Sequence, residues 1–439
     1  MYLFYRILTA ATMLVLAPYY ALRAWRHGES LRSVRERLGS LPPEIAAKAG
    51  ASGAVWIHAV SVGEVLAAKP LVEALKRRFP SRAVFVSTTT ETGRRLACER
   101  LASADAIFYF PLDWRPPVRA ALRAIRPALV VIMETEIWPN FLREARARGV
   151  PVIFASARVS ERSFARFKRW KFLIGPFFAR VMQDAELFLA QTPEDAARLA
   201  EMGTPTERVE VTGNLKYDAE SPPASPFACW LEGEARRQER WPVLVAGSVA
   251  AEEEESVLAA YDIVQRQWRH ALLVLAPRKP DRFDAACAIV AAGGWNVVRR
   301  SRLDLAASLD ESADVIVLDS IGELAGLYAL ADAVFVGGSL VPVGGHNILE
   351  PAWFSRPPVF GPSMENFRQM AAQFLAAQAA VQVASGQQLG KVWVRLIEDD
   401  ALRQRMGAAA RLLAERNRGS AARTLDRIAG LLGSEGGAS

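Results

Sequence analysis

Short apolar strands alternate with amphipathic helices along most of this chain, and this alternation limits its fold more than any other feature. The alternation begins where the apolar run from Val55 to Val60 leads through Ser61 into a segment with apolar residues at helical spacing. Similar pairs recur over residues 83–211 and again over residues 243–360. Strands separated by single helices pair in parallel, so the sequence predicts doubly wound α/β sheets.

The length of 439 residues and one break in the pattern predict two Rossmann-like domains. In the break, Ser221-Pro222-Pro223 and Ser225-Pro226 disfavour regular structure, so we interpret this segment as an interdomain linker. The predicted parts are an N-terminal domain, a linker, a C-terminal domain and a tail, at residues 54–212, 213–241, 242–432 and 433–439. Two such domains would place two sheet edges across a central cleft.

Residues 1–25 are nearly all apolar and are followed by several arginines. This length is near the roughly 20 residues that a helix needs to span a bilayer. Positive charge after the segment predicts that the C-terminal side of the chain stays in the cytoplasm, whereas a cleaved signal peptide carries its charge before the apolar part. We expect a membrane-anchor helix at 1–25 and a basic juxtamembrane connector at 26–53. Spanning and interfacial anchoring both fit, because Pro18 shortens the apolar run.

The net charge of +7 favours an anionic partner, which leaves nucleic acid, an acidic membrane and a phosphorylated substrate open. Basic and aromatic residues interleave mainly in residues 162–172, so nucleic acid is not an expected partner. Three cysteines without C-x-x-C spacing indicate neither a disulfide framework nor a zinc site. No Asp-x-Asp pair and no H-E-x-x-H motif occur, so we expect no metal.

Carboxylates follow two buried strands of the predicted first domain. Glu64 stands in Ser61-x-x-Glu64, which is a capping box when taken alone, although the carboxyl edge of such a sheet also binds ligands. A Glu64 that caps its helix would have a depressed pKa and be a weak base. Glu134 and Glu136 end another strand, and a cap needs only one acid, which favours a functional site. Lys216 is either a solvated lysine or part of the same site.

The second domain contains segments that suit a phosphate. Glycine pairs at Gly337-Gly338 and Gly344-Gly345 allow close backbone approach, and Glu350 one turn after His346 could accept hydrogen bonds from ribose hydroxyls. Arg278 after Pro277 adds fixed positive charge. Ser320, with Glu323, predicts a capped helix whose N-terminus could also meet a phosphate. Tight turns, a solvated basic loop and ordinary caps are the competing interpretations, and no Walker or G-x-G-x-x-G sequence occurs.

Four segments together resemble one family, the 3-deoxy-D-manno-octulosonic acid (Kdo) transferases of lipopolysaccharide assembly. They appear in the order of the family and are Trp56–Glu64 (WIHAVSVGE), Glu134–Asn140 (ETEIWPN), Gly213–Asp218 (GNLKYD) and Gly344–Pro351 (GGHNILEP). The resemblance implies a GT-B glycosyltransferase with a membrane anchor. It also implies transfer of Kdo from CMP-Kdo to a lipid A precursor (lipid IVA), with inversion, without a metal and without any cofactor beyond the donor substrate.

The resemblance also implies roles for individual residues. Glu64 matches the general base of the family, and Glu134 and Lys216 match positions that stabilise the transition state. The CMP-binding segments match Pro277, Arg278, Ser320, Ile321, Gly322, Asn347, Ile348, Leu349 and Glu350. Lys279 departs from the pattern, because many relatives have His there. The implied location is the cytoplasmic face of a bacterial inner membrane, whose lipids would be partners.

Two other functions stay open at this level. One is a GT-B-like enzyme of another reaction, such as a nucleotide-sugar epimerase or a transferase that uses UDP. The other is a membrane-attached protein that binds nucleic acid or acidic lipid without catalysis.

Overall fold

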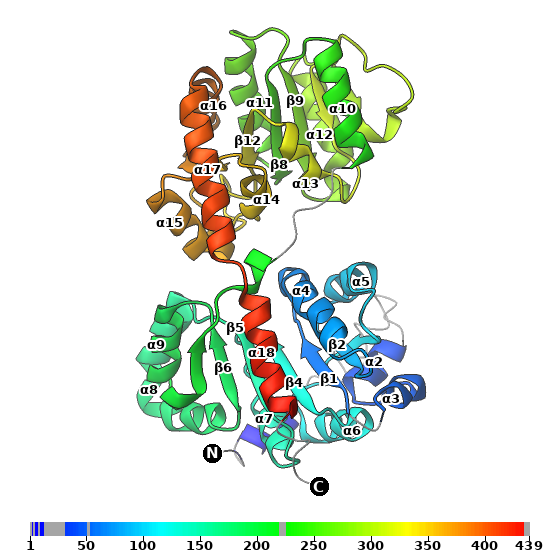
Figure 1. The fold of residues 1–439 in the computed structure, drawn as a ribbon, viewed down its shortest axis with the longest axis vertical. Helices are drawn as coiled ribbons and strands as arrows, with labels where there is room; N and C mark the ends of the chain where they lie inside the picture. The colour runs from blue at the N-terminus through cyan, green and yellow to red at the C-terminus, as the bar shows by residue number, and fades with distance from the viewer. Residues whose placement is uncertain are drawn as a thin grey trace. The chain divides into compact units, whose positions relative to one another are not determined.

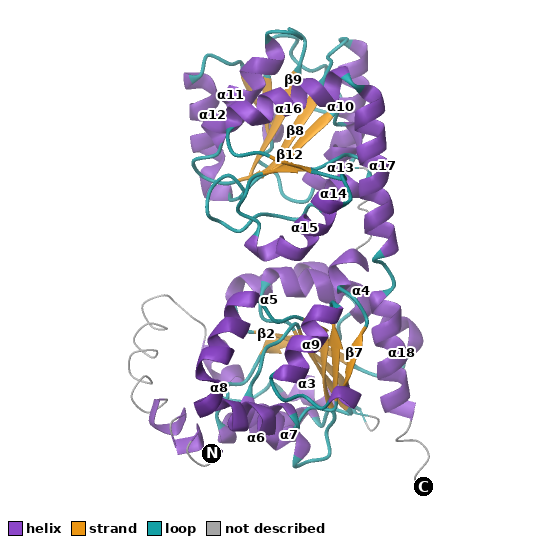
Figure 2. Ribbon diagram, turned by 90° about the vertical axis from the view of Figure 1, so that its left-hand side faces the viewer, coloured by secondary structure: helices purple, strands orange, loops and turns teal. Residues whose placement is uncertain are grey.

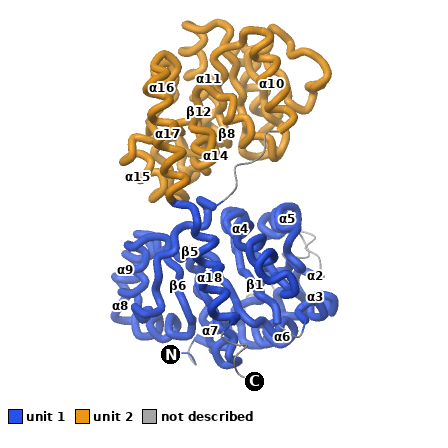
Figure 3. Tube along the Cα trace, viewed as in Figure 1, with its two compact units in different colours: residues 1–220, 417–439 blue, residues 221–416 orange. Residues whose placement is uncertain are grey.

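The chain forms two compact α/β units. The computed structural model describes residues 2, 5–7, 9–12, 31–50, 53–218 and 225–433. Unit 1 comprises residues 1–220 and 417–439, and unit 2 comprises residues 221–416 (Figure 3). Each unit has a seven-stranded parallel sheet with helices on its faces (Figures 1 and 2), which confirms the predicted α/β class.

The sheet of unit 1 has the strand order β3-β2-β1-β4-β5-β6-β7. Its strands are Val55–His58 (β1), Val84–Thr88 (β2), Ala106–Tyr109 (β3), Leu129–Met133 (β4), Val152–Ala157 (β5), Leu187–Ala190 (β6) and Val209–Val211 (β7). The order runs outward in both directions from β1 and β4, so the switch point of the topology lies between these two strands. Side chains alternate between two apolar cores: Trp56 enters one core and Ile57 enters the other.

Helices cover both faces of this sheet. The helices are Leu31–Arg37 (α2), Pro43–Lys48 (α3), Val62–Arg78 (α4), Glu91–Arg100 (α5), Arg115–Ile125 (α6), Pro139–Arg146 (α7), Glu161–Met182 (α8), Pro193–Glu201 (α9) and Ser420–Gly433 (α18), with short 3₁₀ turns at Thr206–Arg208 (η1) and Leu215–Asp218 (η2). Several of them begin with the caps that the sequence indicates. Thr90 and Thr192, for example, accept hydrogen bonds from backbone N–H groups three residues later.

The last helix, α18, belongs to unit 1 although the predicted boundaries assign it to the second domain. Ile428 and Leu432 are buried in the core beside α4, and the carboxylate of Asp218 accepts hydrogen bonds from the N–H groups of Gly419 and Ala421. Helical periodicity shows that α18 has an apolar face, but it does not show which core that face joins. The chain therefore returns to its first unit at its end.

The sheet of unit 2 has the order β10-β11-β9-β8-β12-β13-β14. Its strands are Val243–Val249 (β8), Leu272–Pro277 (β9), Val297–Arg299 (β10), Val315–Val317 (β11), Ala333–Val336 (β12), Val359–Phe360 (β13) and Val381–Gln382 (β14). Its helices are Pro226–Arg237 (α10), Glu254–Gln265 (α11), Phe283–Ala292 (α12), Leu324–Leu327 (α13), Leu349–Trp353 (α14), Arg368–Ala376 (α15), Gly386–Glu398 (α16) and Asp400–Arg416 (α17), with 3₁₀ turns at Pro280–Arg282 (η3), Arg300–Arg302 (η4), Tyr328–Leu330 (η5) and Glu365–Phe367 (η6). The switch point here lies between β8 and β12.

Helix α10 lies within the segment predicted to be a linker without regular structure. That expectation is wrong from Pro226 to Arg237, because Pro226 occupies the first helical position, where a missing N–H costs no hydrogen bond. Ser225 caps the helix by accepting from the N–H of Ala228 at 3.1 Å. The prolines therefore start a helix here, and residues 219–224 of the predicted linker lie outside the described residues.

The predicted membrane anchor at residues 1–25 falls mostly outside the described residues. Among the helices that are described, none is both long enough and apolar enough to cross a bilayer. The hydroxyl of Tyr2 donates to Asp184 at 2.6 Å, and that of Tyr5 donates to Asp113 at 2.9 Å. These described residues are thus attached to unit 1, and the anchor stays a prediction.

Candidate active site

Glu64 closes the first turn of α4 at the carboxyl end of β1. The Ser61 hydroxyl donates to Oε1 of Glu64 at 2.9 Å, and the Val60 N–H donates to Oε2 at 2.8 Å. In return, the Glu64 N–H donates to Ser61 Oγ at 3.4 Å. Ser61 thus caps the helix as the sequence indicates, and Glu64 completes a variant of the capping box through the N–H of Val60 in place of that of Ser61. The residue Glu64 is only 6% exposed.

The expected consequence of this cap, a depressed pKa, is wrong. The pKa of Glu64 is raised from 4.5 to about 7, chiefly because burial disfavours the charged carboxylate and also because the negative charge of Glu134 lies nearby. The hydrogen bonds from Val60 and Ser61 lower the pKa by less than burial raises it. A capping carboxylate can therefore also be a base that works near neutral pH.

Glu134 and Lys216 form an ion pair beside Glu64. Lys216 Nζ donates to Oε1 of Glu134 at 2.9 Å, and both side chains are about one-quarter exposed or less (19% and 26%). Glu134 follows β4, the strand next to β1, and its backbone has φ of 54°, a left-handed conformation that is unusual outside glycine. Burial and the charge of Glu134 also raise the pKa of Glu136. The switch point of unit 1 thus gathers the predicted residues Glu64, Glu134 and Lys216.

A buried polar network that the sequence analysis missed supports Lys216. The Lys216 N–H donates to Oδ1 of Asn214 at 2.9 Å, and Nδ2 of Asn214 donates to Gln191 at 3.1 Å. Gln191 in turn donates to Ser156 Oγ at 3.2 Å, which also accepts from the N–H of Leu215. Ser156 is buried and has φ of 56° at a register shift in β5. No motif marks Ser156 or Gln191, because their partners are distant in the sequence.

In unit 2, Arg278 and the segment His346–Glu350 come together. The Arg278 guanidinium is close enough to the His346 ring and the Glu350 carboxyl to lower the pKa of each. Burial is the larger influence: it holds the pKa of His346 at about 4 and raises that of Glu350 to about 7. Asn347 Nδ2 donates to Glu350 at 3.4 Å. The predicted Pro277–Arg278 and Asn347–Glu350 segments therefore form one cluster at the carboxyl edge of this sheet.

The glycine-rich loop after β12 differs from the expected phosphate cradle. Its N–H groups at Gly338, Ser339 and Leu340 already donate to the carboxylate of Glu253. Helix α14 begins after the loop and has only five residues, so its dipole is small. The charge of Arg278 is therefore the main cationic feature of the cluster.

Ser320, Ile321 and Gly322 follow β11, which pairs with β9, the strand that leads into Arg278. The Ser320 hydroxyl donates to the carboxylate of Glu323, and Arg300 donates to the same carboxylate at 3.0 Å. The predicted capping role of Ser320 is wrong, because α13 starts only at Leu324 and has no side-chain cap. The side chain of Ile321 is 77% exposed.

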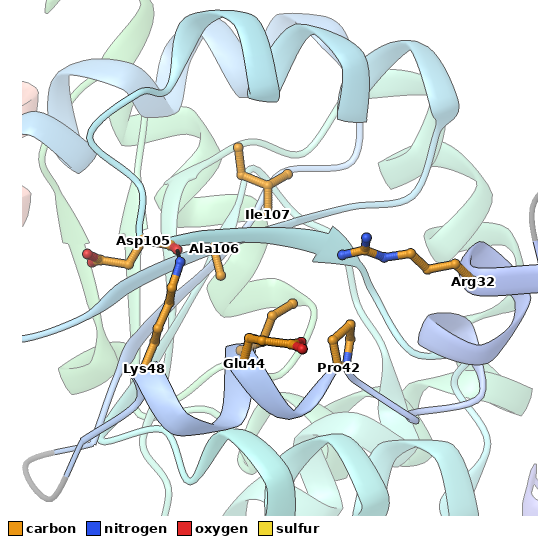
Figure 4. A pocket seen from close by; sticks show the side chains of 8 residues that line it. Arg32, Pro42, Glu44, Lys48, Asp105, Ala106 and Ile107 are labelled. Carbon is orange, nitrogen blue, oxygen red and sulfur yellow. Dashed lines mark hydrogen bonds between the residues drawn. The ribbon is translucent and has the colours of Figure 1, made fainter.

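A cavity of about 540 Å³ lies elsewhere in unit 1, beside α2, α3 and the edge strand β3 (Figure 4). Its lining includes Arg32, Pro42, Glu44, Lys48, Asp105 and Ile107. Lys48 Nζ donates to the backbone oxygen of Asp105, and Lys76 pairs with the Asp105 carboxylate at 2.9 Å. The predicted site residues do not line this cavity. Within the described residues, no cluster of three or more His, Cys, Asp or Glu side chains is arranged to hold a metal ion.

Comparison with known proteins shows the family to which this chain belongs. Residues 32–219 match the family model of 3-deoxy-D-manno-octulosonic-acid transferase (kdotransferase). The 3-deoxy-D-manno-octulosonic acid transferase of Bordetella pertussis is 34% identical over 95% of this chain and 97% of its own length. The corresponding protein of Haemophilus influenzae is 32% identical over 85% of this chain and 86% of its own length. This chain belongs to the Kdo transferase family.

The Kdo transferase is therefore a glycosyltransferase of lipopolysaccharide biosynthesis, as the resemblance implied. Its fold is also shared with more distant enzymes. A solved UDP-N-acetylglucosamine 2-epimerase has a TM-score of 0.56 with 13% identity, over 87% of this chain and 97% of its own. The Staphylococcus aureus MnaA–UDP structure has a TM-score of 0.55 with 15% identity, over 86% and 96%. These likenesses show a GT-B-like fold.

The raised pKa of Glu64 predicts that Glu64→Gln stabilises the protein at alkaline pH. The stabilising effect of a raised carboxyl pKa is complete below about pH 4.5 and is lost as the pH rises through about 7. Gln can keep the bonds to Val60 and Ser61 without a buried charge. We expect the variant to exceed the wild type in free energy of unfolding by on the order of 1–3 kcal/mol at pH 8, with the difference fading toward pH 5.

The free energy of unfolding is measured by denaturant titration at several pH values, with a spectroscopic probe that reports on unit 1. Glu99→Gln is the matched control, because it removes one exposed carboxylate from α5. A destabilised Glu64→Gln at pH 8, or a difference that does not change with pH, would contradict the assignment of a buried carboxylate with a raised pKa.

Proposed function

We propose that this Kdo transferase moves Kdo from CMP-Kdo to lipid IVA with inversion at the anomeric carbon, and that Glu64 is the general base. The observation that carries the proposal is the buried carboxylate of Glu64 with its pKa of about 7. A general base is most effective when its pKa lies near the working pH. The family match supports the sugar that is transferred.

In the proposed step, an acceptor hydroxyl oxygen attacks the anomeric carbon of Kdo. The bond from that carbon to the phosphate oxygen of CMP breaks, and its electron pair leaves with CMP. The hydroxyl proton passes to Glu64, which later releases it to solvent. A single displacement at one carbon inverts its configuration, and the step consumes no cofactor and requires no metal.

The pair of Glu134 and Lys216 suits this donor. Kdo is a sugar acid whose ring gains positive charge as the bond to CMP breaks, while its carboxylate stays negative. An ion pair that is already fixed offers one charge of each sign, without reorganisation during the reaction. We therefore assign Glu134 and Lys216 to stabilisation of the transition state.

The donor nucleotide is assigned to unit 2. Arg278 supplies the positive charge for the phosphate of CMP, and Asn347 and Glu350 supply polar groups for the ribose. We assign Pro277, Ile348 and Leu349 to the backbone framework of the same site, together with Ser320, Ile321 and Gly322 on the neighbouring strand end. CMP has one phosphate, so a guanidinium without a metal ion can balance the charge of the leaving group.

The test is release of CMP by purified full-length protein supplied with CMP-Kdo and tetraacyl lipid A precursor. The wild type should release CMP only when the acceptor is present. Glu64→Gln should lower kcat by about 10²–10⁴-fold while its affinity for CMP is kept, because the CMP segments lie in unit 2. Glu99→Gln should keep the wild-type kcat. Three results would each contradict the proposal. They are the lack of acceptor-dependent CMP release, binding of UDP in clear preference to CMP, and full activity of Glu64→Gln.

We also propose that lipids on the cytoplasmic face of the inner membrane contact α8. On this helix Trp170, Phe172 and Leu173 have exposed fractions of 50%, 95% and 62%. Exposed basic residues accompany them at Arg162, Arg166, Lys168, Arg169 and Lys171. An apolar ridge among cations is typical of a helix that lies in the headgroup region of an acidic bilayer. Phe177 of α8 also contacts the rings of Tyr2 and Tyr5, which belong to the predicted anchor.

This contact predicts that Phe172→Ser/Leu173→Ser raises the KM for acceptor presented in phosphatidylglycerol vesicles by roughly fivefold or more, because apolar surface no longer enters the bilayer. The KM for CMP-Kdo and the activity on detergent-dispersed acceptor should not change. Leu412→Ser, which alters an exposed leucine of α17, is the control. An unchanged KM in vesicles would refute the α8 contact while leaving the transferase reaction intact.

A further inference from the structure

Glu253 is a completely buried carboxylate that accepts four backbone hydrogen bonds. Its Oε2 accepts from the N–H groups of Ala250 at 2.8 Å and Gly338 at 2.6 Å. Its Oε1 accepts from Ser339 at 2.8 Å and Leu340 at 2.7 Å. The exposed fraction of the residue is 0%. Each carboxylate oxygen thus accepts from two backbone N–H groups.

These bonds join the two loops at the switch point of unit 2. Ala250 and Glu253 lie after β8, whereas Gly338 to Leu340 lie after β12, which pairs with β8. The ideal Cβ position of Gly337 would come within 2.6 Å of the backbone oxygen of Ser248 and within 2.9 Å of Oε2 of Glu253, so a side chain there would clash with the end of β8 and with the carboxylate. The β12 loop therefore has glycine where its backbone closes on Glu253.

The loop that Glu253 holds is in direct contact with the donor cluster. The N–H of Gly345 donates to the oxygen of Gly338 at 2.7 Å. Gly338 has φ of 66°, and a Cβ on it would come within 2.8 Å of the His346 ring. The position of Gly338 thus fixes where the backbone of the segment from His346 to Glu350 begins.

We infer that Glu253 is a positioning residue for the donor site, which holds the Gly338–Leu340 loop so that His346–Glu350 is presented to the nucleotide sugar. The inference rests on the assignment of that segment to the donor. It explains why the glycine loop is not a phosphate cradle: three of its N–H groups are used by Glu253. The donor is then recognised by the segment that comes after the loop.

Glu253→Gln tests this role with little change in volume. An amide nitrogen would face N–H donors in place of an acceptor, and the loop would lose hydrogen bonds to a charged group. We expect the KM for CMP-Kdo and the Kd for CMP to rise by roughly tenfold or more, with the acceptor KM within twofold of the wild type. Glu255→Gln, on an exposed residue two positions along, is the matched control and should match the wild type.

A second variant and a binding-independent measurement keep the test decisive if Glu253→Gln folds poorly. Gly338→Ala leaves the Glu253 carboxylate in place but pushes against the His346 ring, and it should raise the donor KM selectively.

Hydrogen–deuterium exchange of residues 337–341 should be slow in the wild type, and faster in Glu253→Gln than in Glu255→Gln. Fast exchange of these amides in the wild type, or donor constants within twofold of the wild type in Glu253→Gln or Gly338→Ala, would overturn the inference. Hydrogen–deuterium exchange does not depend on the identity of the donor. It therefore distinguishes failure of the inference about Glu253 from failure of the proposal that CMP-Kdo is the donor.

Discussion

Burial of the Glu64 carboxylate is the interaction on which the proposed chemistry depends. Two hydrogen bonds within the capping box favour the charged form of Glu64, whereas low exposure and the neighbouring Glu134 favour the neutral form. The second influence is the larger one, so the group has a pKa of about 7. One side chain can thus close the first turn of α4 and also accept a proton.

Both units place their chemistry at the switch point of a parallel sheet, but they use it differently. In unit 1, the strands β1 and β4 end in acids of which one is paired with Lys216, and the result is a site with charges of both signs. In unit 2, the strands β8 and β12 end in loops that are tied together by Glu253, and the result is a fixed backbone beside Arg278. The carboxylates at the switch point of unit 1 suit removal of a proton, and Arg278 in unit 2 suits a phosphate.

The sequence predicts most of this fold, because strand and helix periods are local signals. It also predicts that Glu64, Glu134 and Arg278 follow strands at the carboxyl edge of a sheet, whereas the roles of Glu64, Glu134 and Lys216 come from the resemblance to the family. It does not reveal the unit to which α18 belongs, since an apolar face is compatible with either core. It does not reveal Glu253 either: in the run from Glu252 to Glu255 four acids look like a helix start, and only the distant β12 loop distinguishes one of them. The sequence does not reveal the raised pKa of Glu64 either, because burial depends on packing from the whole unit.

The most direct test of the central claim is the pH dependence of kcat at saturating CMP-Kdo and acceptor. If Glu64 is the base, kcat of the wild type should fall as the pH drops through about 7, because the carboxylate becomes protonated. In Glu134→Gln the same fall should occur at lower pH, since the neighbouring negative charge that raises the pKa of Glu64 is gone. A fall that stays at the same pH in Glu134→Gln, or a wild-type kcat that does not change between pH 5 and pH 8, would contradict the account.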